Sequence, residues 1–461
     1  MTLLEKLALP EIRELIHYRD RETLSEVLNR WLPADIADLL RDLGPYEDIV
    51  AFQCLAPEPA ARTFEHLPHL VQQELFKTLP EEELTRILNE LAPDDRTAAL
   101  EGLSPEEVER LLTLLTPENQ RKTRTLLSHG TGTVGRIMTP DFIGVKESWT
   151  IHQVLDHVRR VGRDSETLNA VYVADDQHHL VDDIRMRDVL LSPPERTIRE
   201  LMDRRYVALQ VTDAESVAVE KFRKYDRTVL PVVDRRGVLL GVVTVDDVLD
   251  IAEESATREI QQFGGVEALD EPYATTPVLS LVKKRAGWLT VLFLGEMLTA
   301  SAMGAFEGEI EKAVVLALFV PLIISSGGNS GSQAATLLVR ALAVGEIKPH
   351  DWRAVLRREV LSGFLLGAVL GAIGFCRIAV WSMFSNIYGE HWPLVGLTVA
   401  VSLLFIVLWG TVSGSMLPIL IKRCGLDPAT SSAPFVATLV DVTGLIIYFT
   451  AAMVVLRGTL L

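Results

Sequence analysis

The pattern of hydrophobic and polar residues changes sharply near residue 280 of this 461-residue chain. Before that point charged residues recur throughout, as in a water-soluble protein, and beyond it apolar residues run almost without interruption. Five apolar stretches approach the roughly 20 residues that an α-helix needs to cross the hydrocarbon core of a bilayer. They predict five membrane-spanning helices, at about 286–306, 312–340, 356–384, 393–421 and 433–456.

The charges of the connecting loops predict the orientation of these helices, because loops rich in Lys and Arg stay in the cytoplasm. Lys283, Lys284 and Arg285 precede the first span, and the loops after the second and fourth spans are also basic. The other two loops, FEGEIEK and SNIYGEHW, are mainly acidic or carry no Lys or Arg. The charged N-terminal stretch does not read as a signal peptide. We therefore expect a multi-pass protein of the cell inner (plasma) membrane, with a cytoplasmic N-terminus and its C-terminus outside.

The first soluble segment carries an internal repeat marked by proline. Prolines recur about every 12 residues, which is the sign of a repeat architecture: they are Pro33, Pro45, Pro57, Pro68, Pro80, Pro93, Pro105 and Pro117. Proline suits the first position of a helix, and the acidic residues that follow it suit the positive end of the helix dipole. Residues 1–130 are therefore predicted to form an all-α superhelical domain of short stacked helices.

The second soluble segment, residues 131–253, holds two copies of a pattern of about 60 residues, again a repeat signature. Each copy predicts a short strand, a helix, two hydrophobic strands joined by a turn, and a second helix. The stretch LPVVDRRGVLLGVVTVDDVLD makes the segment resemble an α/β tandem CBS-domain pair.

Such pairs often bind adenosine nucleotides through a Ser/Thr-x-x-Asp motif, and Thr244 and Asp247 fit it in the second copy. The matching place in the first copy holds Arg187 and Asp188 without the hydroxyl, and Arg227 stands where an aromatic neighbour of the base is wanted. The resemblance therefore offers ATP as a candidate ligand, which the arginines at these positions disfavour.

Composition narrows the function classes. The formal net charge of −17 argues against nucleic-acid binding, which needs a basic surface. It leaves either a solvated acidic surface or a place where clustered carboxylates hold divalent cations. No HExxH motif or histidine cluster indicates a metalloenzyme, so no enzymatic activity is expected. The three cysteines lie far apart, which indicates a reducing compartment.

The second apolar stretch contains the polar run PLIISSGGNSGSQ. Gly327, Gly328 and Gly331 allow either a break in the helix or very close helix packing. Packing does not need Asn329 and Gln333 beside the glycines, so the sequence favours a face that lines an aqueous path.

The fifth span holds a single carboxylate, Asp441, with apolar residues on both sides. A charge at that depth costs about 3 kcal/mol on insertion scales and is rarely kept without a partner or an ion. A two-fold axis would place two such carboxylates opposite each other around one path. The alternative is a helix-pairing carboxyl group bonded to a neighbouring hydroxyl. Glu296 in the first span is a second, weaker candidate.

Taken together, the proline-marked helices, the CBS pair and the motifs PLIISSGGNSGSQ and DPATSSAPFVATLVDVTGLIIYF resemble the MgtE family of bacterial magnesium channels or transporters. The resemblance implies a homodimer whose second and fifth membrane helices line a pore. It implies that Asp441 binds hydrated Mg²⁺ with Ala437 one turn earlier, and that Gly328, Asn329 and Ser332 belong to the pore segment. Asp427 and Glu311 would be acids near the ends of the pore.

The resemblance also implies a regulatory role for cytosolic Mg²⁺, which would bridge the helical domain, the CBS pair and a connecting (plug) helix at 254–282. The implied ligands are Asp94, Asp95, Asp213, Glu215, Asp226, Asp247, Asp250 and Glu259. Ser255 and Arg258 depart from the pattern, because acids are expected there. The membrane domain would comprise residues 283–461.

The expected function is passive, Mg²⁺-selective uptake through the bilayer, gated closed by cytosolic Mg²⁺. Oxygen ligands suit several hard or borderline cations, so a CBS-regulated transporter of Co²⁺ or Mn²⁺ is the alternative. A membrane-tethered nucleotide sensor without transport is a third possibility. No ATP-hydrolysing GxxxxGK[ST] loop is present.

Overall fold

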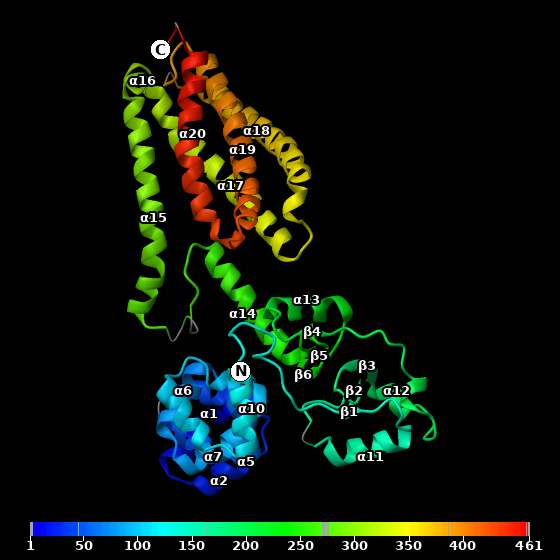
Figure 1. Cartoon of the computed structure of the whole chain (residues 1–461). Coiled ribbons are helices and arrows are strands. Elements are labelled where there is room, and N and C mark those ends of the chain that lie inside the picture. Colours follow the sequence, from blue (N-terminus) through cyan, green and yellow to red (C-terminus); the bar gives the residue numbers. More distant parts are fainter. Residues whose placement is uncertain are drawn as a thin grey trace. The chain divides into compact units, whose positions relative to one another are not determined.

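The computed structural model describes residues 3–44, 46–163, 165–269, 273, 276–385, 387–457 and 459. Within the chain two compact units form, Met1–Glu253 and Glu254–Leu461 (Figure 1). Pro45 of the predicted repeat and residues 270–272, 274 and 275 of the predicted connecting segment lie outside the described residues.

The first unit begins with ten short helices. They are α1 (Leu3–His17), α2 (Arg21–Leu28), α3 (Pro33–Asp42), α4 (Glu47–Gln53), α5 (Pro57–Glu65), α6 (His69–Thr78), α7 (Glu81–Glu90), α8 (Pro93–Ala99), α9 (Pro105–Thr113) and α10 (Pro117–Leu127). Proline opens five of them at the first helical position, and Pro68 and Pro80 cap α6 and α7 one position earlier. One continuous core of Leu, Ile and Phe side chains joins the helices, so the predicted helical domain is confirmed.

The CBS pair follows as two copies of one unit. The first contains β1 (Gly144–Val145), α11 (Ile151–Val161), β2 (Ala170–Ala174), β3 (Leu180–Arg185) and α12 (Met186–Leu190), and the short helix η1 (Ile198–Glu200) leads to the second. The second contains β4 (Leu209–Gln210), α13 (Glu215–Tyr225), β5 (Val229–Val233), β6 (Leu239–Thr244) and α14 (Val245–Phe263). In each three-stranded sheet the short first strand pairs parallel with the middle one, which pairs antiparallel with the last. This is the order predicted from the sequence.

The DRRG turn between β5 and β6 shows why the strands of the second copy meet in register. Gly237 has a φ of +84°, a backbone conformation that glycine adopts readily. The Asp234 carboxylate accepts hydrogen bonds from the backbone N–H groups of Arg236 (2.8 Å) and Val238 (2.9 Å). Asp175 forms the matching turn in the first copy, where it accepts from Gln177 and His179.

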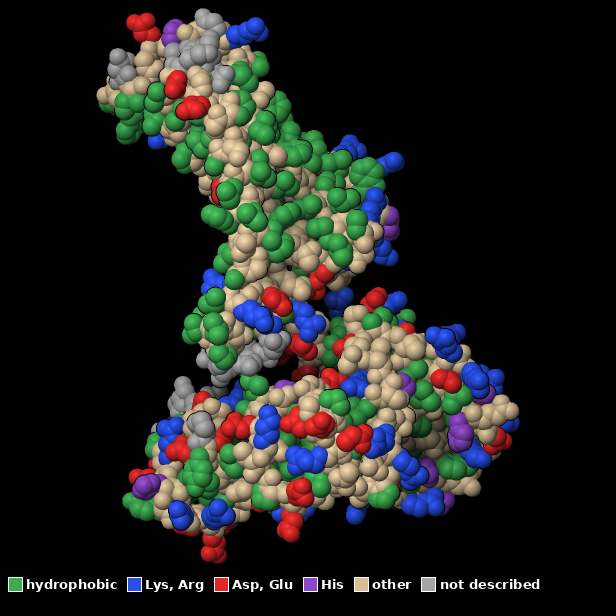
Figure 2. Space-filling view, turned by 60° about the vertical axis from the view of Figure 1, so that its left-hand side comes forward, with side chains coloured by type: hydrophobic (Ala, Val, Ile, Leu, Met, Phe, Trp, Pro, Cys, Tyr) green, Lys and Arg blue, Asp and Glu red, His purple; other side chains and the backbone are tan. Residues whose placement is uncertain are grey.

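Within its described residues, the second unit contains five helical segments long and apolar enough to cross a membrane, as predicted. Its elements are α15 (Val278–Ala305), α16 (Glu307–Lys312), η2 (Val314–Phe319), α17 (Val320–Ala343), η3 (Pro349–Asp351), α18 (Trp352–Ser382), α19 (Trp392–Arg423), η4 (Pro428–Thr430) and α20 (Ala433–Val455). The first span begins at Val278, so the basic residues expected before it lie in its first turns. Figure 2 shows hydrophobic side chains over much of the face of this unit, as lipid contact requires.

Glycines set the spacing between α18 and α19. Gly363, Gly367 and Gly371 recur every four residues and lie on one face of α18. A Cβ added at Gly367 would stand 2.7 Å from the Leu404 carbonyl oxygen and 2.8 Å from its Cα. The two backbones therefore touch directly, which is how membrane helices pack without a hydrophobic driving force between them.

Candidate ion-binding sites

The glycine-rich segment of α17 is a continuous α-helix, so the alternative of a broken helix is wrong and close packing is what the glycines provide. A Cβ added at Gly327 would lie 2.5 Å from Cγ2 of Ile406 and 2.8 Å from Cγ1 of Val440. At Gly331 it would lie 2.9 Å from Cγ1 of Val436. The buried face of α17 is thus fitted between α19 and α20.

The opposite face of α17 is polar and exposed in the protomer. Residues spaced by three or four positions form one stripe along it: Ser325, Asn329, Gln333, Thr336 and Arg340. The Asn329 amide donates to Ser325 Oγ at 3.3 Å, within the same stripe. Lipid does not solvate such groups, so this face requires water or another protein surface.

Asp441 on α20 lies beside Gly328, at the edge of the buried face of α17. A Cβ added at Gly328 would be 3.3 Å from Asp441 Oδ1 and 3.5 Å from the Ala437 Cβ. The absent side chain at Gly328 therefore leaves room for the carboxylate. Among the described residues, no Lys, Arg or His lies within ion-pair distance of Asp441, whereas Glu296 of α15 is close enough for the two carboxylates to interact.

The other predicted pore residues lie in the same unit, on α17, on α16 and at the start of η4. Ser332 donates its hydroxyl to the Ala433 carbonyl at 3.2 Å and so links α17 to α20. Asp427 caps η4 by accepting from the Ala429 N–H at 2.9 Å. Glu311 is exposed on α16. Burial and the nearby Asp427 carboxylate raise the pKa of Glu259, which places these two acids close together.

The last turns of α14 pack against the helices that carry Asn329 and Asp441. Phe263 contacts a small cluster formed by Ala335 of α17 with Val436 and Val440 of α20. A few residues on, Gly265 approaches Trp288 so closely that a Cβ would stand 2.6 Å from its ring. The Trp288 indole N–H donates to Ser432 Oγ at 2.9 Å, at the start of α20. A displacement of the end of α14 would therefore be felt by α17 and α20.

The first unit gathers six carboxylates between the helical domain and the CBS pair. We call them the junction acids: Glu65, Asp94, Asp95, Glu166, Asp246 and Asp247. Three come from α5 and α8, one from the loop after α11, and two from the start of α14. Sequence reasoning found Asp94, Asp95 and Asp247 but missed the other three, because no local pattern links positions so far apart in the chain.

Burial and mutual repulsion raise the pKa values of five junction acids, Glu65, Asp94, Asp95, Glu166 and Asp247. Burial raises the pKa of Asp95 to about 8, with further contributions from Glu65 and Asp247. Burial and the Glu166 carboxylate raise the pKa of Glu65 to about 7. Burial likewise raises the pKa of Asp247 to about 7, although its hydrogen bond from Thr244 acts to lower it. Such a group of acids is a natural receptor for positive charge.

Of the remaining predicted metal ligands, Asp250 adjoins this group on α14, and Asp213, Glu215 and Asp226 lie on or beside α13. The Asp213 carboxylate accepts from the backbone N–H of Gln210 at 3.0 Å and is 3.5 Å from the Lys221 ammonium group. Glu215 begins α13, and Asp226 ends it in a left-handed conformation with a φ of 48°. Asp250 lies one turn after Asp246, and burial followed by the Asp246 charge raises its pKa.

The nucleotide motif is engaged internally. Thr244 donates its hydroxyl to Asp247 Oδ2 at 2.6 Å, so both motif groups already have a partner. A cavity of about 620 Å³ lies elsewhere in the pair, where Arg187 and Arg227 are among the lining residues. Arg227 forms a 3.0 Å ion pair with Asp183 there. Arg227, which stands where an aromatic neighbour of the base is expected, thus has an acidic partner in this cavity. Asp188 is mostly exposed on α12.

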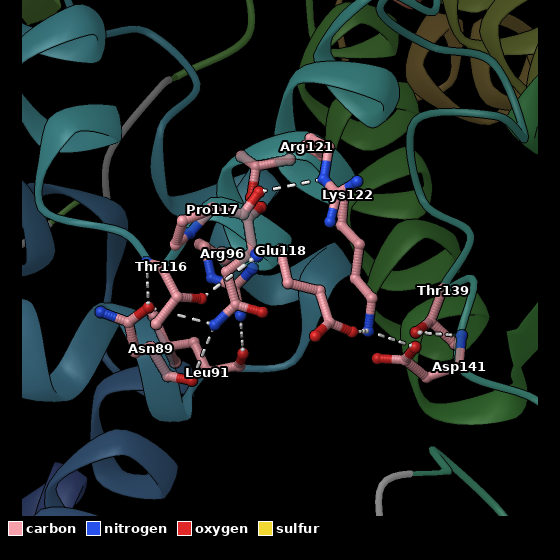
Figure 3. A network of polar contacts seen from close by, with 12 residues as sticks. Asn89, Leu91, Arg96, Thr116, Pro117, Glu118, Arg121, Lys122, Thr139 and Asp141 are labelled. Atoms are coloured by element: carbon pink, nitrogen blue, oxygen red, sulfur yellow. Dashed lines mark hydrogen bonds and ion pairs between the residues drawn. The ribbon is translucent and has the colours of Figure 1, made fainter.

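Direct side-chain contacts also hold the helical domain against the CBS pair (Figure 3). The Lys122 ammonium group of α10 lies 2.7 Å from Asp141 Oδ1 and 3.3 Å from Glu118 Oε1. Arg136 donates to Glu101 at 2.6 Å and to the Leu127 carbonyl at 2.7 Å. These contacts join the two domains without a metal ion.

No three His, Cys, Asp or Glu side chains come close enough to hold one metal ion directly, in the part of the chain that the structure describes. Mg²⁺ keeps several of its waters in most protein sites and is bound by one or two carboxylates. The surroundings of Asp441 and the junction acids are therefore better suited to a hydrated ion than to one stripped of its water.

A protein with five membrane-spanning helices, an acid placed among them and a CBS pair with a helical domain before it belongs to the class of membrane ion transporters. Three family descriptions match successive parts of the chain: the MgtE intracellular N domain over residues 31–131, the CBS domain over 134–194 and 198–254, and the divalent cation transporter MgtE over 320–451. The chain belongs to the MgtE family of magnesium transporters. It is thus a multi-pass membrane protein with a cytosolic N-terminal domain.

Relatives of known name support this assignment. The magnesium transporter MgtE of Thermus thermophilus is 40% identical over 325 residues, which is 70% of each chain. That of Enterococcus faecalis is 32% identical over 326 residues, 70% of this chain and 69% of the relative. The crystal structure of the cytosolic domain of the Mg²⁺ channel MgtE in complex with ATP is similar with 33% identity and a TM-score of 0.51, over 53% of this chain and 99% of that one. These relatives are transporters, which is not an enzymatic function.

Proposed function

We propose that two copies of this chain form a pore that admits hydrated Mg²⁺ passively, and that cytosolic Mg²⁺ bound at the junction acids closes it. The observation that carries the proposal is Asp441, a carboxylate of a membrane helix that lies beside Gly328 without a basic partner among the described residues. A buried acid is rarely kept in a bilayer without a partner or an ion.

The exposed polar stripe of α17 supports a pore that a second copy completes. In one protomer Asn329 and Gln333 face outward, where a lipid environment would leave their amides unsatisfied. A two-fold axis along this face would enclose both stripes and bring two Asp441 carboxylates to one path. The amides and carboxylates would then surround water instead of lipid.

Such a path can select a divalent ion without dehydrating it. Mg²⁺ gives up its waters reluctantly, and paired Asp441 carboxylates can accept hydrogen bonds from those waters. Two negative charges favour a dication over Na⁺ or K⁺. A negative-inside membrane potential favours entry by about 2.3 kcal/mol per charge per 100 mV, doubled for Mg²⁺. No further energy source is then required.

The junction acids supply a sensor for the ion on the cytosolic side. The pKa values of Glu65, Asp95 and Asp247 are raised by burial and by neighbouring acids, so bound Mg²⁺ would relieve repulsion and draw the helical domain and the CBS pair together. Residues 254–282 would transmit the change, because Phe263 packs against α17 and α20. Arg258 forms a 2.6 Å contact with Glu254, which weakens the attraction of this helix for cations.

The topology that fits this proposal has residues 1–130 and 131–253 in the cytoplasm, residues 283–461 in the inner membrane and the C-terminus outside. The basic residues Arg340, Lys422 and Arg423 mark one end of the helices, as expected for the cytoplasmic side. A protease site added after residue 457 should be cut only from outside the cell. Cutting from the cytoplasm alone would contradict the topology.

Flux through reconstituted vesicles tests the pore. The full-length protein, with Mg²⁺ varied separately on each side, should carry Mg²⁺ down its gradient without ATP and slow when Mg²⁺ is raised on the side of the soluble domains. Equal rates of Mg²⁺ flux with and without the protein would show that the protein forms no pore. Equal or faster flux of Mn²⁺ or Co²⁺ would favour the alternative of another divalent cation as the main substrate.

Limited proteolysis tests the gate. Chelation of Mg²⁺ should increase cleavage within residues 251–280, because repulsion among the junction acids would then loosen the segment that follows them. Unchanged cleavage would show that the junction acids do not control the gate. It would not contradict the proposed pore.

A further inference from the structure

A second feature of the membrane unit lies away from Asp441. A cavity of about 330 Å³ opens between α18, α19 and α20, and we call it the α19 slot. Its wall is almost entirely apolar and is formed by Trp352, Trp409, Met416, Leu420 and Leu439, among others. Leu420 is 60% exposed and Trp409 41% exposed, so the slot is open along its side.

The slot is long and runs along the membrane helix. Its lining residues on α19 extend from Trp409 to Arg423, 14 positions apart, which is about 21 Å at the rise of an α-helix. Half of the roughly 30 Å hydrocarbon core belongs to each leaflet. The slot therefore reaches through the depth of one leaflet, a shape that suits a single extended acyl chain.

Cations stand at one end of the slot. Arg423 is the last residue of α19, and its guanidinium lies 5.8 Å from the centre of the Trp352 ring. Arg353 lies over the same ring at 5.3 Å. Arg423 also donates to the Pro349 carbonyl from Nε at 3.2 Å and from Nη2 at 2.8 Å, which fixes its position.

These two arginines lack an acidic partner within the described residues, where no carboxylate comes within ion-pair distance of either. A guanidinium that is held in place and keeps unused N–H groups is suited to a phosphate. The end of α19 also belongs to the basic, cytoplasmic side of the helices, where anionic lipids make the membrane surface negative. Tryptophan beside it is typical of the interface between headgroups and hydrocarbon.

We propose that the α19 slot binds one anionic phospholipid of the cytoplasmic leaflet. One acyl chain would lie along Met416, Leu420 and Leu439, and the phosphate would receive hydrogen bonds from Arg423 and Arg353. Leu439 places the lipid against α20, two residues before Asp441. The site is separate from the polar stripe of α17 and does not depend on how ions pass.

Native mass spectrometry of the full-length protein with added phosphatidylglycerol or phosphatidylcholine tests the site. The protein should hold phosphatidylglycerol more tightly, at one molecule per protomer above the level set by phosphatidylcholine. Arg423→Gln should weaken the binding of phosphatidylglycerol by at least about fivefold, because one basic residue near an anionic lipid contributes about 1 kcal/mol. Arg357→Gln is the matched control: it removes one exposed cation of α18 that does not line the slot, and should change binding less than about twofold.

Ser413→Phe gives an independent test, because it fills the slot and leaves every arginine in place. The Ser413 hydroxyl is buried and makes no hydrogen bond within the described residues, so its replacement removes no polar contact. Binding of both lipids at the slot should fall. Equal affinity for the two lipids in the unchanged protein, or equal effects of Arg423→Gln and Arg357→Gln, would overturn the proposal.

A photoreactive residue at position 420 identifies the occupant directly. An adduct with the mass of phosphatidylglycerol supports the lipid. A covalent protein dimer formed through position 420 would show that a second copy of the chain covers the slot, and would overturn the proposal. An adduct of detergent that phosphatidylglycerol does not displace would overturn it as well.

Discussion

The two acidic regions of this protein hold their carboxylates in opposite ways. Asp441 is a single acid in a membrane helix, set against glycine backbone that leaves room for it. The junction acids are six and come from four separate segments, and burial together with mutual repulsion raises the pKa values of five of them. One region positions the carboxylate of a membrane helix by packing, and the other accumulates charge by bringing domains together.

The difference suits two different tasks. A permeation site must bind an ion and release it, which a small number of acids per protomer, here Asp441 with Glu296 near it, allows. A sensor must change its structure when the ion arrives, which requires like charges whose repulsion the ion relieves. Mutations in the membrane unit should therefore change the rate of Mg²⁺ flux. Mutations at the junction should change how the gate depends on pH and Mg²⁺.

The largest expected effect is on transport. Asp441→Asn keeps the size of the side chain and removes its charge, so Mg²⁺ flux in vesicles should fall about 10- to 100-fold, the equivalent of about 1.5–3 kcal/mol for lost contacts to a charged group.

Glu359→Gln is the control for Asp441→Asn. It makes the same chemical change on α18, a helix that carries none of the polar stripe, and flux should stay within about twofold. If Asp441→Asn transports Mg²⁺ at the normal rate, or Glu359→Gln loses as much flux, the proposal that Asp441 is the ion-binding acid of the membrane unit is wrong.

The next effect concerns the packing that positions the polar stripe and Asp441. Gly414→Ala would put a methyl group into the backbone of Gly331, because the added Cβ would overlap its carbonyl. Overpacking of this kind costs about 1–3 kcal/mol, so the thermal midpoint of the purified protein should fall by several degrees. Gly304→Ala is the matched control, since nothing lies within 4 Å of the Cβ it adds. A similar midpoint for both variants would show that α17 and α19 are not packed as described.

Some features of the two units can be predicted from the sequence, and others cannot. Span length predicted all five membrane helices, and proline spacing predicted the starts of α3, α5, α8, α9 and α10, because both signals are local. Local signals could not show that α17 stays helical through its glycines, which depends on the contacts of Gly327 and Gly331 with other helices.

Distant contacts explain the remaining differences. Glu65, Glu166 and Asp246 become neighbours only when the helical domain meets the CBS pair, and nothing in their own segments indicates it. Thr244 and Asp247 fit a nucleotide motif by spacing, yet they bond to each other. Spacing along the chain gives the reach of a side chain but does not give its partner.

The third effect is a pH dependence confined to the junction. Asp95, Glu65 and Asp247 have pKa values of about 8, 7 and 7 in the folded protein, above those of an unfolded chain. For acids with a raised pKa, the folded junction is most stable at low pH and loses stability as pH rises through these values. Without Mg²⁺, cleavage within residues 251–280 should therefore be slower at about pH 5 than at about pH 8.

Saturating Mg²⁺ should remove most of this pH dependence, because it replaces the protons. Asp95→Asn should also reduce it, since the amide cannot ionise. Asp213→Asn serves as the control, because Asp213 lies outside the junction beside Lys221, and its replacement should leave the pH dependence unchanged. Cleavage that is independent of pH in the unaltered protein would contradict the raised pKa values.

The smallest effect tests whether the junction depends on its acids alone. Lys122 joins α10 to Asp141 at 2.7 Å without any ion, but both side chains are partly exposed, and such pairs contribute about 0–1 kcal/mol. Lys122→Gln should therefore raise cleavage within 251–280 by less than about fivefold in the absence of Mg²⁺, and by less still when Mg²⁺ is present. Lys146→Gln is the matched control, because Lys146 pairs with Asp176 inside the first CBS copy and does not reach the helical domain. A loss of Mg²⁺ protection in Lys122→Gln as large as that in Asp95→Asn would show that direct ion pairs, not a shared cation, hold the two domains together.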